Sequence, residues 1–246
     1  MNPRCVEQEK MDKGILYEIL DKIIHEKTFG TTIRMAWPAI LESFFISFAG
    51  LVDSFMVSMM GSNAVAAVGL TTQPKFMGLS LFFAVNVAIS ALVARRRGEK
   101  KQDEANRLLV TCLVFVVLAA VALSVFFVFA ASPILRLCGS TEETHADAVL
   151  YMQIIMGGMI FNCIQMAVNS AQRGAGNTKI TMKTNVTSNT INIIFNYLLI
   201  NGHFGFPAWG ITGAALATIL SQIVSLIIQI KIFSYYFFTS FFILIP

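Results

Sequence analysis

The sequence is short of charged side chains. Asp, Glu, Lys and Arg make up only 13% of its 246 residues, whereas soluble globular proteins carry about 25%. Hydrophobic residues make up 56%, and the mean hydropathy is +0.69. This composition excludes a disordered chain and disfavours a water-soluble enzyme, so we expect a protein surrounded by lipid.

Cysteine and histidine are also scarce, and neither is spaced for metal chemistry. The four cysteines are Cys5, Cys112, Cys138 and Cys163. They show no CxxC or Cys/His pattern, so neither a disulfide framework nor a metal site is indicated. The three histidines lie outside the apolar runs, which disfavours a membrane-embedded metalloenzyme. The net charge of +4 does not indicate nucleic acid binding, because the basic residues form short groups between apolar runs.

Six apolar runs are long enough to cross about 30 Å of hydrocarbon, which takes about 20 helical residues. They cover residues 33–60, 76–94, 108–131, 148–171, 184–200 and 211–233. The fifth run is short and polar, but without it the basic loops on its two sides would face opposite compartments. The runs are too long and continuous for a transmembrane β-barrel. The sequence therefore predicts an all-α integral membrane protein with six transmembrane helices over residues 33–233.

The distribution of basic residues predicts the orientation. Of the 18 Lys and Arg residues, 16 fall on one side of the six runs, and only Lys75 and Arg136 fall on the other. The positive-inside rule then places both termini in the cytoplasm of a multi-pass plasma membrane protein. Residues 1–32 form a separate segment, in which apolar residues at helical spacing over 15–24 predict an amphipathic helix on the inner membrane surface. The motif STEE at residues 140–143 predicts a capping box that opens the fourth helix.

Two acids lie inside the predicted spans, and both are in the first. Glu42 and Asp53 are eleven residues apart, which returns to within about 20° of the same helix face. A charge at membrane depth costs at least about 2.5 kcal/mol, so an intramembrane acid indicates a functional site unless it only ties helices together. No Lys or Arg is expected in the central part of a span.

Three polar stripes accompany these acids. The fourth span carries Asn162, Gln165, Asn169 and Gln172; the fifth carries Asn185, Asn189, Asn192 and Asn196; the sixth carries Thr218, Gln222, Ser225 and Gln229. Each set recurs every three or four residues and so shares one helix face. Such stripes do not face lipid, because each unpaired group there costs several kcal/mol. They either form interhelical hydrogen bonds or, as we expect for many of them, line a wet cavity.

Three of these polar residues are expected to lie at a similar depth in the membrane. Counted at 1.5 Å per residue, Asp53, Asn196 and Thr218 lie about 18 to 22 Å from the inner surface. An acid, amides and a hydroxyl at that depth suit a proton, a sodium ion or a polar organic cation.

Four stretches of the sequence resemble one known family. They are AWPAILESFFISFAGLVDSFMVSMMGSNAVAAVGL (36–70), VARRRGEKKQDEANR (93–107), QRGAGNTK (172–179) and LINGHFGFPAWGITGAALAT (199–218). Together they resemble the N-terminal lobe of a MATE (multidrug and toxic compound extrusion) transporter over residues 36 to about 230. The resemblance implies one six-helix lobe of an antiporter that exports organic cations in exchange for protons or sodium. It implies no cofactor besides the coupling ion.

The resemblance also implies roles for single residues. Asp53 stands at the family's first-helix aspartate, and Asn192 and Asn196 stand at its fifth-helix Asn-x-x-x-Asp pair, with an amide replacing the second acid. Thr218 matches the sixth-helix threonine, near the carbonyl of Ala214. Asp53, Asn192, Asn196 and Thr218 then form a possible sodium site, although the lost acid weakens the case for sodium. Pro38 matches a proline that bends the first helix.

The remaining polar residues of the interior are expected to line the substrate cavity. They are Glu42, Asn162, Gln165, Asn169, Asn189 and Gln222. Glu42 does not belong to the general family pattern, so its assignment depends on its membrane depth alone.

The length and the end of the chain differ from the family pattern. Family members have about twelve helices, and residues 234–246 are an apolar tail without the charged linker expected between lobes. We therefore expect a truncated half, with the missing C-terminal lobe or a second copy as its partner in the lipid bilayer. An inactive fragment, an accessory membrane subunit and a lipid-linked sugar flippase of the same superfamily stay open as alternatives.

Overall fold

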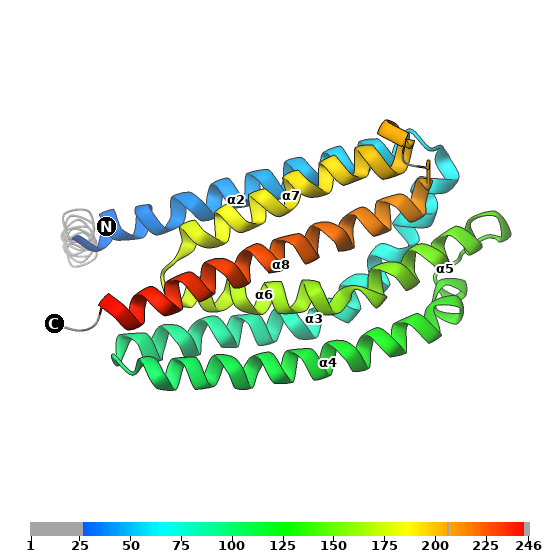
Figure 1. The fold of residues 1–246 in the computed structure, drawn as a ribbon. Coiled ribbons are helices and arrows are strands. Elements are labelled where there is room, and N and C mark those ends of the chain that lie inside the picture. The colour runs from blue at the N-terminus through cyan, green and yellow to red at the C-terminus, as the bar shows by residue number, and fades with distance from the viewer. Residues whose placement is uncertain (1–26, 206, 244–246) are drawn as a thin grey trace, which may run out of the picture.

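The computed structural model describes residues 27–205 and 207–243, which form helices joined by short turns. The helices are α2 (Lys27–Ser58), α3 (Ser62–Gly98), α4 (Gln102–Leu137), α5 (Glu142–Gly157), α6 (Met159–Gly174), α7 (Thr178–Asn201), the short 3-10 helix η1 (His203–Gly205) and α8 (Gly210–Ile243). They run side by side along one axis, and the first and last described residues lie at the same end of the bundle (Figure 1). The all-helical prediction is confirmed for this part of the chain.

Five of the predicted spans each fall on one helix and the fourth falls on the pair α5 and α6, but the count of six is not confirmed. Within the described residues, α2, α3, α4 and α8 are long and apolar enough to cross a membrane, and α5 with α6 makes a fifth span if the pair, bent by 45°, is taken as one. α7 does not qualify, since its asparagine stripe lowers its hydropathy. Its 24 residues nevertheless make a rod of about 36 Å, packed between α2 and α8.

Other boundaries differ from the predicted ones. The predicted amphipathic helix over residues 15–24 lies outside the described residues. α2 begins at Lys27 and α8 continues to Ile243, so the limits drawn at residues 32 and 233 both fall inside helices.

Lys75 corrects the prediction that no Lys or Arg lies in the central part of a span. α3 begins at Ser62 and runs through Pro74 to Gly98, so Lys75 is inside the helix and half-buried. The sequence Gln-Pro-Lys resembles a polar break between runs. A proline removes one backbone hydrogen bond from a helix without always ending it.

The cap of α5 is also shifted from its predicted position. The N-cap residue is Thr141, and its backbone N–H donates to Thr144 Oγ1 over 3.3 Å. The box thus uses two threonines in place of Ser140 and Glu143. The Ser140 hydroxyl instead bonds to His145 Nδ1 at 2.7 Å.

The packing separates an apolar core from a polar seam. Large buried side chains such as Phe82, Ile89 and Met152 belong to the group formed by α3, α4, α5 and α6. α8 packs against α5 and α6 on one side and against α7 on the other, and α2 packs on α7. α2, α7 and α8 form a second group. The polar stripes of α6, α7 and α8 meet in the seam between the two groups.

Gly213 allows α8 to approach α7 closely. A Cβ at this position would collide with the backbone carbonyl of Leu199 in α7. Glycine is therefore required for the contact. The approach places Thr218, just over one turn further along α8, beside the asparagine stripe of α7.

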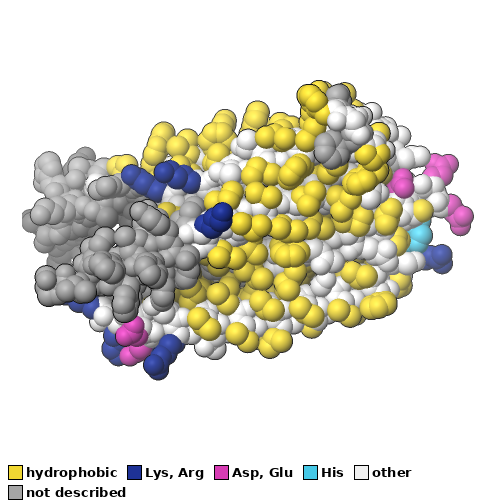
Figure 2. Space-filling view, in the orientation of Figure 1, with side chains coloured by type: hydrophobic (Ala, Val, Ile, Leu, Met, Phe, Trp, Pro, Cys, Tyr) yellow, Lys and Arg dark blue, Asp and Glu magenta, His cyan; other side chains and the backbone are white. Residues whose placement is uncertain are grey.

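The surface is divided by chemistry in the way expected of a membrane protein. Figure 2 shows apolar side chains along the middle of the bundle and charged side chains gathered at its two ends. We call the end with the α3–α4 and α6–α7 turns the basic end. The apolar belt includes Trp37, Phe44 and Phe55 of α2, each more than half exposed.

Candidate cation site

Asp53 of α2 lies at the centre of a hydrogen-bonded cluster. Asn196 Nδ2 of α7 donates to Asp53 Oδ1 at 2.7 Å, and also to Asn192 Oδ1 at 3.2 Å. Asn196 is only 2% exposed. The predicted residues Asp53, Asn192 and Asn196 are thus brought together from segments separated by more than one hundred residues.

The side-chain amide of Asn192 can donate to Asp53 when its oxygen and nitrogen positions are exchanged. With its oxygen and nitrogen exchanged, it donates to Asp53 Oδ1 and Oδ2 at 3.1 Å each. Both asparagines then present N–H groups to the carboxylate. In the unexchanged orientation, Asn192 Oδ1 accepts the bond from Asn196, and Asn192 Nδ2 lies 3.4 Å from Thr218 Oγ1.

Thr218 extends the cluster to α8. Its hydroxyl donates to the carbonyl of Ala214 at 3.0 Å. A carboxylate, amide oxygens, a hydroxyl and a carbonyl are hard oxygen ligands, the kind that bind sodium or a proton. Asn196 Oδ1 is buried without a hydrogen-bond partner among the described residues, so one further acceptor is available beside Asp53.

Two groups that the sequence did not indicate also act on Asp53. Lys75 of α3 and Tyr151 of α5 both interact electrostatically with it. The hydrogen-bonded residues of the site come from α2, α7 and α8, and Lys75 and Tyr151 lie within electrostatic range of its carboxylate. No cluster of three or more His, Cys, Asp or Glu residues suitable for a metal ion occurs in the described part of the chain.

Glu42 belongs to a separate network nearer the basic end. It is 5% exposed, and its Oε1 accepts from Arg173 Nη2 at 2.8 Å and from Asn185 Nδ2 at 2.5 Å. This ion pair joins α2 to α6, and the amide joins α2 to α7. These two contacts come from residues 131 and 143 positions away along the chain, so no local pattern indicates the pair.

The network continues as a chain of amides. Asn169 Nδ2 donates to Asn185 Oδ1 at 2.9 Å, and Gln229 Nε2 donates to Asn169 Oδ1 at 2.5 Å. Gln165 Nε2 reaches Asn185 Oδ1 more weakly, at 3.4 Å. The predicted cavity residues Glu42, Gln165 and Asn169 are thus buried in hydrogen bonds that join α2, α6, α7 and α8.

The other predicted residues contribute less to these two networks. Asn162, Asn189 and Gln222 are half-buried, and Asn162 Oδ1 has no hydrogen-bond partner among the described residues. Pro38 is buried within α2, which stays helical through it. Assignment of these residues to a substrate cavity or a hinge stays a prediction.

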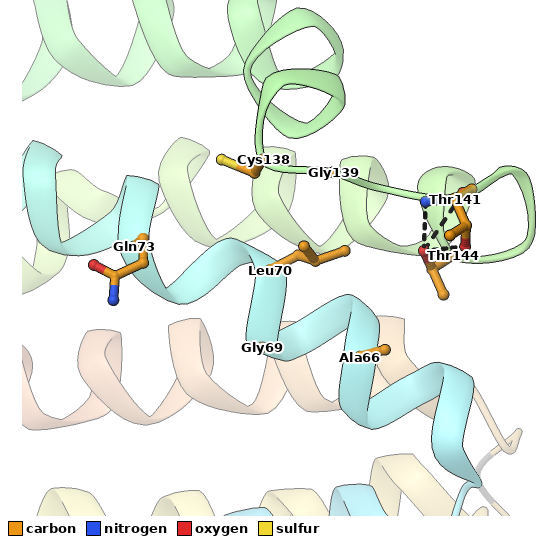
Figure 3. A pocket seen from close by; sticks show the side chains of 8 residues that line it. All are labelled: Ala66, Gly69, Leu70, Gln73, Cys138, Gly139, Thr141 and Thr144. Carbon is orange, nitrogen blue, oxygen red and sulfur yellow. Dashed lines mark hydrogen bonds between the residues drawn. The ribbon is translucent and has the colours of Figure 1, made fainter.

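A pocket of about 620 Å³ lies at the end of the bundle opposite the basic end. Its lining comes from α3, including Leu70 and Gln73, and from the turn that carries Cys138 and the bonded pair Thr141 and Thr144, all labelled in Figure 3. It contains none of the predicted cation-site residues. We therefore place the candidate cation site at Asp53 and not in this pocket.

The long apolar helices and the buried polar clusters define a multi-pass membrane protein. Residues 38–198 match the MatE family, and the chain belongs to this family. It is 28% identical to the uncharacterized transporter YisQ of Bacillus subtilis over 84% of this chain and 45% of YisQ. It is 31% identical to the probable multidrug resistance protein YoeA of the same organism, over 78% of this chain and 42% of YoeA.

A solved structure of a MATE transporter has a similar fold over nearly half of its length. The outward-facing conformation of a multidrug resistance MATE family transporter of the MOP superfamily superimposes with a TM-score of 0.76 at 25% identity, covering 89% of this chain and 47% of that one. The chain spans a little under half the length of the curated relatives it matches.

Proposed function

We propose that this chain forms the ion-coupling lobe of an antiporter that exports organic cations in exchange for protons or sodium. The observation that carries the proposal is the contact of Asp53 with the amides of Asn192 and Asn196. An acid that accepts hydrogen bonds from neutral donors inside a membrane bundle is suited to gain and lose its charge during transport. The names of the relatives, a transporter and a probable multidrug resistance protein, agree with export.

The coupling cycle follows from the charge of Asp53. When it is ionised, the carboxylate accepts hydrogen bonds from the two amides and attracts a cationic substrate. Neutralised by a proton or by sodium entering from outside, it loses this attraction and releases the substrate. α2 carries both Asp53 and Pro38, so a bend at the proline transmits the change to the rest of the lobe.

The proton is the favoured coupling ion. Asn196 occupies a position where the family resemblance implies an acid, so the cluster has one carboxylate in place of two. Sodium sites gain affinity from ligand charge, whereas proton binding needs a single carboxylate. The nearby Lys75 lowers the affinity for sodium further through like-charge repulsion.

Alternating access needs a second lobe. Transporters built from repeats place their sites at the interface between halves. The second half comes either from the C-terminal lobe of a full-length transporter or from a second copy of this chain. A lipid-linked sugar flippase would use a basic cavity, and Lys75 beside Asp53 gives no net positive charge there.

The test is export of ethidium from bacteria that lack their own efflux pumps. Three forms are expressed: the chain alone, two copies in tandem, and the chain fused to the C-terminal half of YoeA. We expect at least one form to lower ethidium accumulation, with full-length YoeA as the positive control. If YoeA lowers accumulation and none of the three forms does, the proposal is wrong.

A further inference from the structure

A groove runs along the outside of the bundle, with α6 as its floor and α4 and α8 as its walls. α4 and α8 both pack on α6. The cavity of about 860 Å³ falls within the ~300–1,000 Å³ typical of ligand sites. Its apolar lining comes from all three helices: Leu109 and Leu113, Ile164 and Val168, and Leu226 and Ile230. It contains neither Asp53 nor any other residue of the cation site.

The charged and amide side chains of the groove all lie at one end, and Thr111 is the one other polar residue of its lining. Asn106 and Arg107 line it near the start of α4, and Gln229 joins them from α8. These residues lie at the basic end, which the distribution of Lys and Arg predicts to be cytoplasmic. The groove therefore has a cationic mouth at the level of the lipid headgroups and an apolar length along the hydrocarbon.

Arg107 is available to bind an anion. Its neighbours Arg96 and Lys101 form ion pairs with Glu104, at 3.0 and 3.1 Å. Arg107 is exposed and forms no ion pair with the described residues. Its charge at the mouth also disfavours an organic cation as the occupant.

The α8 wall of the groove holds an unsatisfied acceptor at the polar end. Gln229 is 3% exposed, and its Nε2 donates to Asn169, whereas its Oε1 has no hydrogen-bond partner among the described residues. This open acceptor beside the mouth is an observation independent of the charge of Arg107.

We propose that this groove binds one anionic phospholipid of the cytoplasmic leaflet. The phosphate contacts Arg107, and one acyl chain lies along the apolar lining. Basic pockets between transmembrane helices on the cytoplasmic side are suited to anionic headgroups. The proposal concerns lipid binding, and it holds or fails independently of transport.

The test is native mass spectrometry of the purified full chain after exchange into detergent containing phosphatidylglycerol or phosphatidylcholine. Arg107→Gln removes the cation, with Arg97→Gln as the control because Arg97 is an exposed arginine at the same end, outside the groove. Val168→Phe fills the floor, with Val125→Phe on the lipid-facing side of α4 as its control. Circular dichroism verifies that each variant is folded.

We expect wild-type protein to retain one phosphatidylglycerol in preference to phosphatidylcholine. Arg107→Gln should weaken retention about fivefold, the effect of one basic residue near an anionic surface. Val168→Phe should abolish it, and both controls should match wild type. Equal loss with Arg97→Gln, equal retention of phosphatidylcholine, or displacement of the lipid by ethidium would each overturn the proposal.

Discussion

Asn196 donates its side-chain amide to Asp53 over 2.7 Å, and so joins α7 to the membrane-embedded acid of α2. Where the family resemblance implies a second acid, this chain has a neutral donor aimed at the first. The hydrogen-bonded cluster therefore contains one carboxylate among the described residues. Four of the predictions below concern this site or the network beside it.

Restoring a carboxylate at position 196 should change the coupling ion. Asn196→Asp gives the cluster two acids, and we expect the sodium concentration for half-maximal export to fall about tenfold, because ligand charge sets the affinity for hard cations. Export by the active form is measured against sodium concentration. Asn189→Asp, on the same helix but outside the Asp53 cluster, is the control. Equal sodium dependence in both variants would contradict the assignment of Asn196.

Removing Lys75 should strengthen the binding of organic cations. A positive charge near Asp53 repels a cationic substrate, and about 1 kcal/mol of repulsion at an interior dielectric corresponds to about fivefold in affinity. Lys75→Gln should lower the half-saturating ethidium concentration by that factor. Lys183→Gln, an exposed lysine at the basic end, should leave it unchanged. An unchanged value in Lys75→Gln would show that this lysine does not face the substrate.

The ion pair between Glu42 and Arg173 should stabilise the bundle. Arg173→Gln leaves Glu42 buried without its counter-charge, and we expect a loss of about 2 kcal/mol in the free energy of unfolding. This is less than a fully buried pair would lose, since Arg173 is half exposed. In the double variant with Glu42→Gln the effect of Arg173→Gln should nearly vanish. Unfolding in detergent of all four proteins gives the coupling energy, and strictly additive losses would count against the pair.

The close approach of α8 to α7 depends on Gly213. Gly213→Ala places a Cβ against the Leu199 carbonyl, and we expect a loss of about 1–3 kcal/mol in unfolding free energy, as for other overpacked sites. Gly50→Ala in α2 is the matched control, because no atom lies within 4 Å of its added Cβ. The control should be neutral or stabilising, since alanine favours helices over glycine. Equal effects of the two changes would contradict the packing described here.

Residues with a local signature were predictable from the sequence, and contacts across the fold were not. Asp53 stands out as an acid in an apolar run, and the recurrence of Asn192 and Asn196 places both on one face of α7. Thr218 was matched by depth and by family resemblance. Nothing local marks Arg173 as the partner of Glu42, since the contact spans 131 residues of chain.

Two further features escaped prediction for physical reasons of their own. The apolar pattern predicts a second span that begins only at residue 76, but α3 continues through Pro74 and carries Lys75 into the bundle. The break between α5 and α6 falls at Gly158, where a Cβ would collide with Ile219 of α8. That bend is set by tertiary contact, which hydropathy does not detect.

The most direct test of the central claim is proton-driven ethidium export in inverted membrane vesicles containing the active form. Asp53→Asn is compared with wild type and with Ser54→Ala, an exposed neighbour on α2 whose hydroxyl donates to the carbonyl of Gly50 in its own helix. We predict that Asp53→Asn reduces gradient-driven export to less than about a tenth, the scale of losing a group that acts directly in coupling, whereas Ser54→Ala stays at the wild-type rate. Full gradient-driven export by Asp53→Asn, at equal protein levels in the membrane, would contradict the account.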